Sequence, residues 1–465
     1  MTEITKSITF PNEYKTLKGA VQQGKTPLLA VGLSAIHKAH LAAALGLDTG
    51  RPVCVLTDDD SAAARFTLDL QAFAEREVLT LPARELVMAD VVGVSRGYEQ
   101  KRLAVLDALP NAAFSVASVQ AAVQRTLPPD ALQSAVVELA VGQTVSLETL
   151  TQQLTRAGYE RCVQVEGIGQ FSVRGGILDV FPPQAANPYR VEFWDDEIDS
   201  IATFDVGSQR RLETAQTLRC LPCMETLPYL APGGAKGLAK AVRGLLSTRK
   251  KKHPDLASHI ERDAERLEET GALPAADKYL PLVYPEMATA LDYLPENVIL
   301  LIEDTPRLRD AVRDFTSRIA DDVTALLERG EIAPGLDGYA LDFAALARTP
   351  HTILRLDSFL NNVPELAPQH LENFVANQMN AYGGNLDMAA ADIRGYTQQG
   401  RAVAVLCGSA LRCQNMCDAL TEAGLTATVS DLLPKGGQVC VMEGTLSAGF
   451  EYPDLGLVVI TEGQV

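Results

Sequence analysis

The chain has 465 residues, a formal net charge of −18, and a hydrophobic fraction of 47%. This length predicts roughly three domains of about 150 residues each, and the hydrophobic fraction suffices for ordinary buried cores. The acidity excludes a protein that coats nucleic acid, because such a surface repels phosphates at long range, although a local basic patch remains compatible with DNA.

No segment of the sequence has the pattern of a membrane or secretion signal. The first residues, MTEITKSITF, lack the basic and then apolar order of a signal peptide. No apolar run approaches the ~20 residues that a membrane span needs. Eight cysteines in so long a chain do not indicate a disulfide framework. We therefore expect a cytoplasmic protein.

Strands and helices alternate in the first part of the chain. Apolar runs predict buried strands at 27–31, 53–57 and 114–118. Segments rich in Ala and Leu predict helices between them, at 34–46, 60–75 and 97–109. This alternation is typical of a parallel sheet with helices on its faces. We expect residues 1–128 to form one α/β unit.

The pattern changes after residue 128. One helix is predicted, with Ser146 as its N-cap, Glu148 in its first turn and Gly158 at its end. From residue 161 to 221 strand follows strand, with turn residues between them. Residues 129–223 therefore read as a separate α+β module.

Helices are predicted over most of residues 224–358, around a strand at 296–304. This part includes the basic run TRKKKH, which we interpret as a solvated helix end or loop because the acidic helix IERDAERLEE stands beside it. A linker is expected at 356–369. Alternating strands and helices return in residues 370–465, which predict a small α/β domain. Because Val465 directly follows a strand, we expect the chain to be a fragment of a longer protein.

Gly32, His37, Lys38 and Ala39 have the spacing of a phosphate-binding loop, between a strand and a helix. The second glycine of such a loop lets backbone N–H groups wrap the phosphates, and a Ser or Thr hydroxyl binds Mg²⁺. Here His37 and Ala39 occupy those positions, and no acidic motif for Mg²⁺ follows. We expect an inactive strand-to-helix turn, with ATP binding as the alternative.

Two cysteine pairs have a spacing that metal sites use, Cys220 with Cys223 and Cys413 with Cys417. No histidine neighbours either pair, and the pairs lie far apart in the sequence. We expect buried free thiols and no metal.

The stretch YRVEFW, residues 189–194, sorts its side chains between the two faces of a strand. Arg190, Glu192 and Trp194 share one face, and Arg174 lies on the corresponding face of the strand FSVR. Arg and Trp dominate protein-binding hot spots, because they combine a planar donor fork with a large contact area. The alternative is that Trp194 packs beneath a loop and the charges are merely solvated.

The segments VRGGILDVFPP, YRVEFWDDEIDSIATFDVGSQR and LPCME resemble the interaction domain shared by excinuclease UvrB and bacterial transcription-repair-coupling factors. The second family fits better. Its N-terminal part is similar to excinuclease UvrB but lacks a working ATP site, as the loop from Gly32 to Ala39 does. The segment 84–106, where excinuclease UvrB has a long aromatic-rich hairpin, is short here and has one aromatic residue, Tyr98.

The resemblance implies a multidomain α/β fold. It consists of a degenerate P-loop, helicase-like parallel-sheet domain in two parts, an inserted α+β interaction domain and a C-terminal small α/β domain. These correspond to residues 1–128 and 224–358, 129–223, and 370–465. Arg174, Arg190, Glu192 and Trp194 would then bind excinuclease UvrA. Trp194 stands where the family often has Phe, and Ser172 stands where excinuclease UvrB can carry another arginine.

The resemblance also implies an adaptor without catalytic residues or a cofactor of its own, which recruits excinuclease UvrA in transcription-coupled repair. ATP and Mg²⁺ would serve the translocase motor of the full-length protein. RNA polymerase and duplex DNA would be bound by its C-terminal domains. Two alternatives stay open: an ATP-binding helicase-like repair protein similar to excinuclease UvrB, and an unrelated acidic α/β enzyme with a site at a sheet edge.

Overall fold

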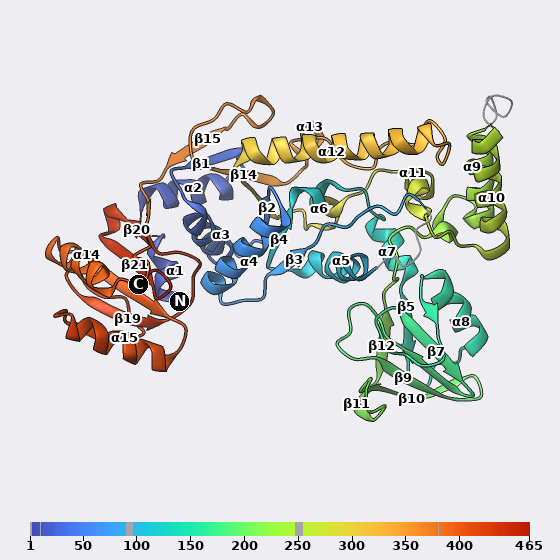
Figure 1. The fold of residues 1–465 in the computed structure, drawn as a ribbon, viewed down its shortest axis with the longest axis horizontal. Helices are drawn as coiled ribbons and strands as arrows, with labels where there is room; N and C mark the ends of the chain where they lie inside the picture. Colours follow the sequence, from blue (N-terminus) through green and yellow to red (C-terminus); the bar gives the residue numbers. More distant parts are fainter. Residues whose placement is uncertain (1, 10, 90–95, 247–253, 380) are drawn as a thin grey trace.

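The computed structural model describes residues 2–9, 11–89, 96–246, 254–379 and 381–465 (Figure 1). Their centre is a large parallel sheet with helices on both faces. An antiparallel module hangs from one end of this layered body, and a small domain with its own sheet packs at the other end. The α/β multidomain class predicted from the sequence is confirmed.

The large sheet has seven parallel strands in the order β15-β1-β14-β13-β2-β4-β3. Their bounds are β1 Leu28–Val31, β2 Val53–Thr57, β3 Leu79–Leu81, β4 Phe114–Ser118, β13 Ile299–Glu303, β14 Thr352–Asp357 and β15 His370–Asn373. The central strands are buried on both faces, as the continuous apolar runs predicted.

Helices cover this sheet from both sides. One face packs against α2 Asn12–Gln22, α3 Ala35–Thr49 and α4 Asp60–Ala74. The other packs against α5 Gly97–Ala108, α6 Val119–Val123 and α12 Thr305–Glu328. Because β13 and β14 occupy the middle of the sheet, residues 224–358 complete the domain that residues 1–128 begin. The hairpin of α9 Gly234–Gly244 and α10 Pro254–Thr270 extends from its far end (Figure 1). The basic run at 248–253 lies outside the described residues.

The inserted module is built on a six-stranded sheet in the order β11-β10-β9-β8-β7-β6. Its strands are β6 Glu160–Arg161, β7 Gln170–Arg174, β8 Ile177–Val180, β9 Tyr189–Trp194, β10 Glu197–Phe204 and β11 Arg211–Ala215. Helix α8, Leu147–Arg156, packs Leu150 and Leu154 into the core of the module. Ser146 accepts a hydrogen bond from the Thr149 N–H at 3.2 Å, so the predicted N-cap is present. The chain enters and leaves through the paired strands β5 Val137–Ala140 and β12 Thr217–Cys220.

The small domain has a second, mostly parallel sheet in the order β16-β20-β21-β17-β19-β18. Its elements are β16 Asn377–Gln378, α14 Leu386–Gln398, β17 Ala402–Cys407, α15 Ala410–Glu422, β18 Ala427–Val429, β19 Val439–Glu443, β20 Phe450–Tyr452 and β21 Leu457–Thr461. Residues 370–373, which the sequence assigned to this domain, instead form the edge strand β15 of the large sheet. The expected linker at 356–369 also begins inside β14, which ends at Asp357.

The cysteines pack in apolar cores. Cys220 and Cys223 lie in the core of the module, and Cys413 and Cys417 lie in that of the small domain. Burial raises the pKa of the Cys220 thiol to about 12. Among the described residues, no group of side chains has the composition of a metal site, and no helix combines the length and hydrophobicity needed to cross a membrane.

The small domain docks on the large domain through an aromatic cluster around His40 of α3. The imidazole stacks on Phe73 at 4.5 Å. Its Nε2 donates to the Thr5 carbonyl at 3.0 Å, so Nδ1 accepts from the Tyr452 hydroxyl at 3.1 Å. Nearby, the Asp69 carboxylate accepts from the N–H and hydroxyl of Ser447, at 2.8 and 2.6 Å. The loop 444–449 is thus hydrogen-bonded to α4.

Buried charges join the two halves of the large domain to the exit of the module. The Arg84 guanidinium contacts Asp277 at 2.7 Å and Glu225 at 3.0 Å, and Arg102 contacts the same Glu225 oxygen at 3.0 Å. Glu99 accepts from the Glu225 backbone N–H at 2.7 Å. Burial alone would raise the pKa of Asp277, but Arg84 and hydrogen bonds from Thr226 and Val87 outweigh it, and the net direction is down. The carboxylate therefore stays ionised inside the fold.

Asp277→Asn should destabilise the protein strongly, because it leaves Arg84 short of its closest counter-charge in a buried site. Removing one partner of a buried pair costs about 3–5 kcal/mol. Urea unfolding followed by circular dichroism measures the loss. Asp314→Asn is the control, since its pair with Arg313 is exposed on α12; equal losses for the two variants would contradict a structural role for the network.

The stability of the protein should fall in acid because of His40. Burial lowers the pKa of this imidazole to about 4, whereas an unfolded histidine titrates near 6.5. Its contribution is therefore complete above about pH 6.5 and is lost as the pH falls toward the folded value, with the loss reaching about 2 kcal/mol near pH 5. His40→Gln cannot titrate, so the difference in unfolding free energy between about pH 7.5 and pH 5 should shrink by that amount. An unchanged difference would refute this assignment.

Candidate functional site

Three neighbouring strands of the module place the predicted docking residues on one face of its sheet. The register aligns Arg174 of β7 with Ile177 of β8 and Glu192 of β9, and it aligns Ser172 with Asp179 and Arg190. Directly opposed residues of antiparallel strands share a face. The alternate row packs toward α8 in the core. The period-2 sorting of side chains therefore predicted correctly which of these residues share a face of the sheet.

Trp194 lies at the end of β9 with 82% of its surface exposed. It does not pack beneath a loop. An indole left in water on a folded domain carries a large apolar area with no intramolecular partner, which is typical of a contact residue in a binding surface. A turn at Asp195 and Asp196 follows the strand.

The two arginines converge on a carboxylate that the sequence did not single out, that of Asp179. Arg190 donates from Nε to Asp179 Oδ1 at 2.7 Å and from Nη2 to Oδ2 at 2.9 Å. Arg174 donates from Nη2 to the same Oδ2 at 2.8 Å. Asp179 is buried, with 1% of its surface exposed. Period-2 alternation puts Asp179 on the polar face, but its contacts depend on cross-strand register, which the local pattern does not give.

The two arginines differ in how much of each side chain is left exposed for a partner to contact. The Arg174 side chain is 50% exposed, whereas that of Arg190 is 22% exposed. Arg190 also bonds the carbonyl and side-chain oxygens of Gln209, and its guanidinium lies 4.5 Å from the centre of the Phe204 ring. Hydrogen bonding to Asp179 raises the pKa of Arg190 above its ordinary value. The N–H donors of Arg190 are therefore largely used in contacts within the module.

Glu192 and Ser172 complete the face. Glu192 is half-buried and accepts a hydrogen bond from the Ser200 hydroxyl at 2.8 Å. Ser172, at the position where excinuclease UvrB can carry an arginine, is buried. Among the predicted docking residues, the groups offered to water are thus Arg174, Trp194 and part of Glu192.

The loop with phosphate-loop spacing has a different environment. Gly32 has a φ of +84°, and a Cβ there would collide with the Phe374 carbonyl oxygen. His37 is buried, with its Nδ1 2.7 Å from the Ser34 hydroxyl. Its ring centre lies 5.3 Å from that of Phe450 and 4.9 Å from that of Tyr452. The loop therefore contacts the small domain at the position where a nucleotide-binding protein holds phosphates.

The remaining loop residues are also engaged. Lys38 is buried, and its Nζ lies 3.6 Å from a Glu303 carboxylate oxygen at the end of β13. Ala39 is fully buried in the core that spans both domains. Burial lowers the pKa of His37 to about 3, so its imidazole is neutral. The position of the Mg²⁺ ligand thus has no hydroxyl, and the lysine of the loop is not accessible to a phosphate.

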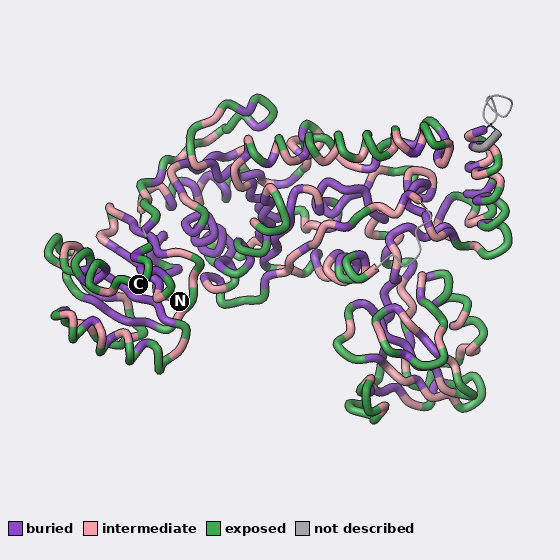
Figure 2. Tube along the Cα trace, in the orientation of Figure 1, coloured by how far each residue is buried: buried purple, intermediate pink, exposed green. Residues whose placement is uncertain are grey.

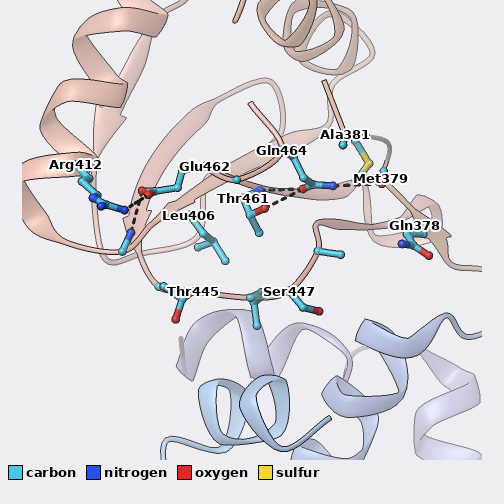
Figure 3. A pocket seen from close by; sticks show the side chains of 15 residues that line it. Gln378, Met379, Ala381, Leu406, Arg412, Thr445, Ser447, Thr461, Glu462 and Gln464 are labelled. Carbon is cyan, nitrogen blue, oxygen red and sulfur yellow. Dashed lines mark hydrogen bonds and ion pairs between the residues drawn. The ribbon is translucent and has the colours of Figure 1, made fainter. Parts of the chain in front are cut away.

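A cavity of about 400 Å³ opens over the carboxyl ends of β17, β19 and β21 in the small domain (Figure 3). Its ionisable lining residues are Arg412 and Glu462, which pair with each other. Glu462 also accepts from the Gly408 N–H at 3.1 Å. Ser447 and Thr445 lie on the loop that faces the large domain. Among the described lining residues, the carboxylate of Glu462 is thus already engaged by Arg412 and the Gly408 N–H.

Figure 2 shows the module as a body whose outer strands and turns are largely exposed, in contrast to the buried centre of the large domain. The face with Arg174 and Trp194 therefore differs in accessibility from the loop between Gly32 and Ala39. The face is open to a macromolecular partner, whereas the loop is covered by the chain itself.

Comparison with known proteins agrees with this geometry. Residues 137–225 match the family model of the UvrB interaction domain. The whole chain aligns with the transcription-repair-coupling factor of Bacillus subtilis (strain 168) at 31% identity, over 40% of that protein. It also aligns with the transcription-repair-coupling factors of Staphylococcus epidermidis and Staphylococcus aureus (strain MRSA252), at 27% and 24% identity over 65% of this chain and 26% of theirs.

The chain thus spans two-fifths or less of the length of these relatives. The similarity to the Bacillus protein covers every part of the fold described above, and the family model coincides with the inserted module. The chain is therefore a homologue of transcription-repair-coupling factors along its whole length, and its inserted module is a UvrB interaction domain.

Proposed function

We propose that this chain is the N-terminal adaptor region of a transcription-repair-coupling factor and that it recruits excinuclease UvrA to lesions where RNA polymerase has stalled. The observation that carries the proposal is the open face of the UvrB interaction domain, where Arg174 of β7 and Glu192 and Trp194 of β9 lie on either side of β8. A cationic fork, a carboxylate and an exposed indole form a compact binding epitope.

The chemistry of this face defines what it can bind. Arg174 offers N–H donors to a carboxylate, Glu192 offers acceptors to a basic group, and Trp194 offers apolar area. A partner that presents an acidic group, a basic group and an apolar side chain complements this face. A central Arg or Trp in such an interface contributes about 2–4 kcal/mol of binding free energy.

The ATP-dependent motor and its Mg²⁺, and the contacts with RNA polymerase and duplex DNA, belong in this proposal to other parts of the full-length protein. The 465 residues act without catalytic groups or a cofactor. The loop from Gly32 to Ala39 supports this proposal, because its side chains at positions 37–39 are buried in contacts within the protein, including contacts between two domains.

Arg174→Ala combined with Trp194→Ala should abolish measurable binding to purified excinuclease UvrA, because the two changes remove the most exposed donor fork and the indole. Each should weaken binding about 30-fold or more. Isothermal titration calorimetry measures the affinity, and the melting temperature should stay near that of the wild type, since Trp194 projects into water and Asp179 keeps Arg190 as its counter-charge. This pair is cleaner than Arg174 with Arg190, whose joint removal would strand buried Asp179 without a counter-charge.

The matched control is Arg313→Ala with Phe359→Ala, an exposed arginine and an exposed aromatic residue on the large domain. It should bind as the wild type does. Wild-type affinity in a well-folded Arg174 and Trp194 double variant would count decisively against this site.

ATP with Mg²⁺ should show no saturable binding to this chain, because the loop is filled by the side chains of the protein itself. Lys38→Ala should lower the melting temperature instead, since it leaves the partly buried Glu303 without its nearest cation. Saturable binding of ATP that Lys38→Ala abolishes would favour the alternative, an ATP-binding repair protein similar to excinuclease UvrB.

A further inference from the structure

Asp179 is an acidic residue at the centre of a face whose proposed contacts are made by its neighbours. It lies on β8 between the strands that carry Arg174 and Arg190. One carboxylate oxygen accepts from Arg190, and the other accepts from both arginines. With 1% of its surface exposed, it cannot itself contact a partner. Any effect it has on docking must act through the arginines.

Arg190 is nearly saturated by contacts within the module. A guanidinium has five N–H donors. Four hydrogen bonds to Asp179 and Gln209 occupy Arg190, and the Phe204 ring covers one side of its guanidinium. Gln209 is fixed in turn, because its amide donates to the Val206 carbonyl at 2.8 Å. Arg190 therefore holds Asp179 in place and neutralises it.

Arg174 has the opposite character. It stands at the end of β7, beside the tight turn at Gly175 and Gly176, and half of its side chain is exposed. Its hydrogen bond to Asp179 anchors one nitrogen of the guanidinium. A free arginine on a surface samples many rotamers, and ordering it on binding weakens the complex. The hydrogen bond to Asp179, which we call the anchor, holds one guanidinium nitrogen. It removes much of that rotamer freedom before the partner binds.

We propose that Asp179 is the positioning residue of the docking face, holding the Arg174 guanidinium so that its remaining N–H groups meet a carboxylate on the partner, with Arg190 as internal counter-charge. This inference rests on the proposed function and refines it, because it gives Arg174 and Arg190 different tasks. The three groups carry a net charge of +1, which favours an acidic side chain on the partner opposite Arg174.

The test compares Asp179→Asn in two backgrounds of the complete 465-residue chain. In the wild-type background, the loss of the anchor should weaken binding to purified excinuclease UvrA about tenfold. In the Arg174→Ala background the same change should alter the affinity by less than about threefold, because coupled residues are not additive. Glu148→Gln, an exposed carboxylate on α8 at the opposite side of the sheet, is the control and should bind as the wild type does.

A second measurement separates positioning from simple destabilisation. Trp194 is the one tryptophan of the chain, so its emission and its quenching by iodide report on this face alone. Both should be the same in Asp179→Asn as in the wild type. The heteronuclear NOE of the Arg174 Nε–H, which reports its motion without any partner, should drop in the variant. If Asp179→Asn fails to fold, Asp179→Glu keeps the charge but moves the anchor, and it should give the same losses.

The outcomes distinguish this inference from the proposed function. If the wild type binds and Arg174→Ala weakens binding, but Asp179→Asn binds as tightly as the wild type, positioning by Asp179 is wrong and recruitment stands. An equal loss in both backgrounds would also overturn it, because Asp179 would then act independently of Arg174. If the wild type does not bind at all, recruitment fails, and an unaltered NOE for Arg174 would reject the anchor on its own.

Discussion

The buried charges around Arg84 are the constraint on which the architecture depends. Arg84 and Arg102 lie in the first part of the large domain, Asp277 lies in its second part, and Glu225 stands just beyond the exit of the inserted module. Charges taken out of water are tolerable only while each has a partner. Separation of any of these segments would leave an unpaired charge inside the protein. The two parts of the chain that flank the module are therefore bound together at its root.

This constraint explains how a domain interrupted by about 90 residues still forms one sheet. Strands β13 and β14 must find places between β1 and β2, although the module separates them in the sequence. The buried charges select specific partners that lie far apart in the sequence. Burial of apolar area in the core stabilises the fold but does not specify which segments pair. The module is attached through the paired strands β5 and β12, so it leaves the body as a unit with a single base (Figure 1).

Local patterns were sufficient to predict most helices and strands, and to predict which side chains share one face of the module's sheet. The strands at 53–57 and 114–118, and the helix capped by Ser146, follow from periodicity and capping alone. The face with Arg174 and Trp194 follows from period-2 alternation. Strand β14 was missed because its buried Arg355 and Asp357 pair with each other at 2.6 Å, and charged residues interrupt the apolar run that marks a strand. Edge strand β15 was missed because its residues alternate without a buried face.

What the sequence could not give was contact between distant residues. Asp179 meets Arg190 across a strand pair, and His37 meets Tyr452 across 415 positions of the chain. Neither pairing leaves a trace in composition or spacing. The residues of the loop from Gly32 to Ala39 depart from the phosphate-binding pattern, and only the three-dimensional arrangement reveals that His37 and Ala39 pack between two domains.

This packing constrains which side chains can stand at positions 37 and 39. Glycine at position 37 would delete a ring packed against Phe450 and Tyr452, and serine at position 39 would place a hydroxyl in an apolar core. Either change toward the phosphate-binding pattern would therefore loosen the joint between the domains. The joint between the domains and the phosphate-binding pattern thus make incompatible demands on the same positions.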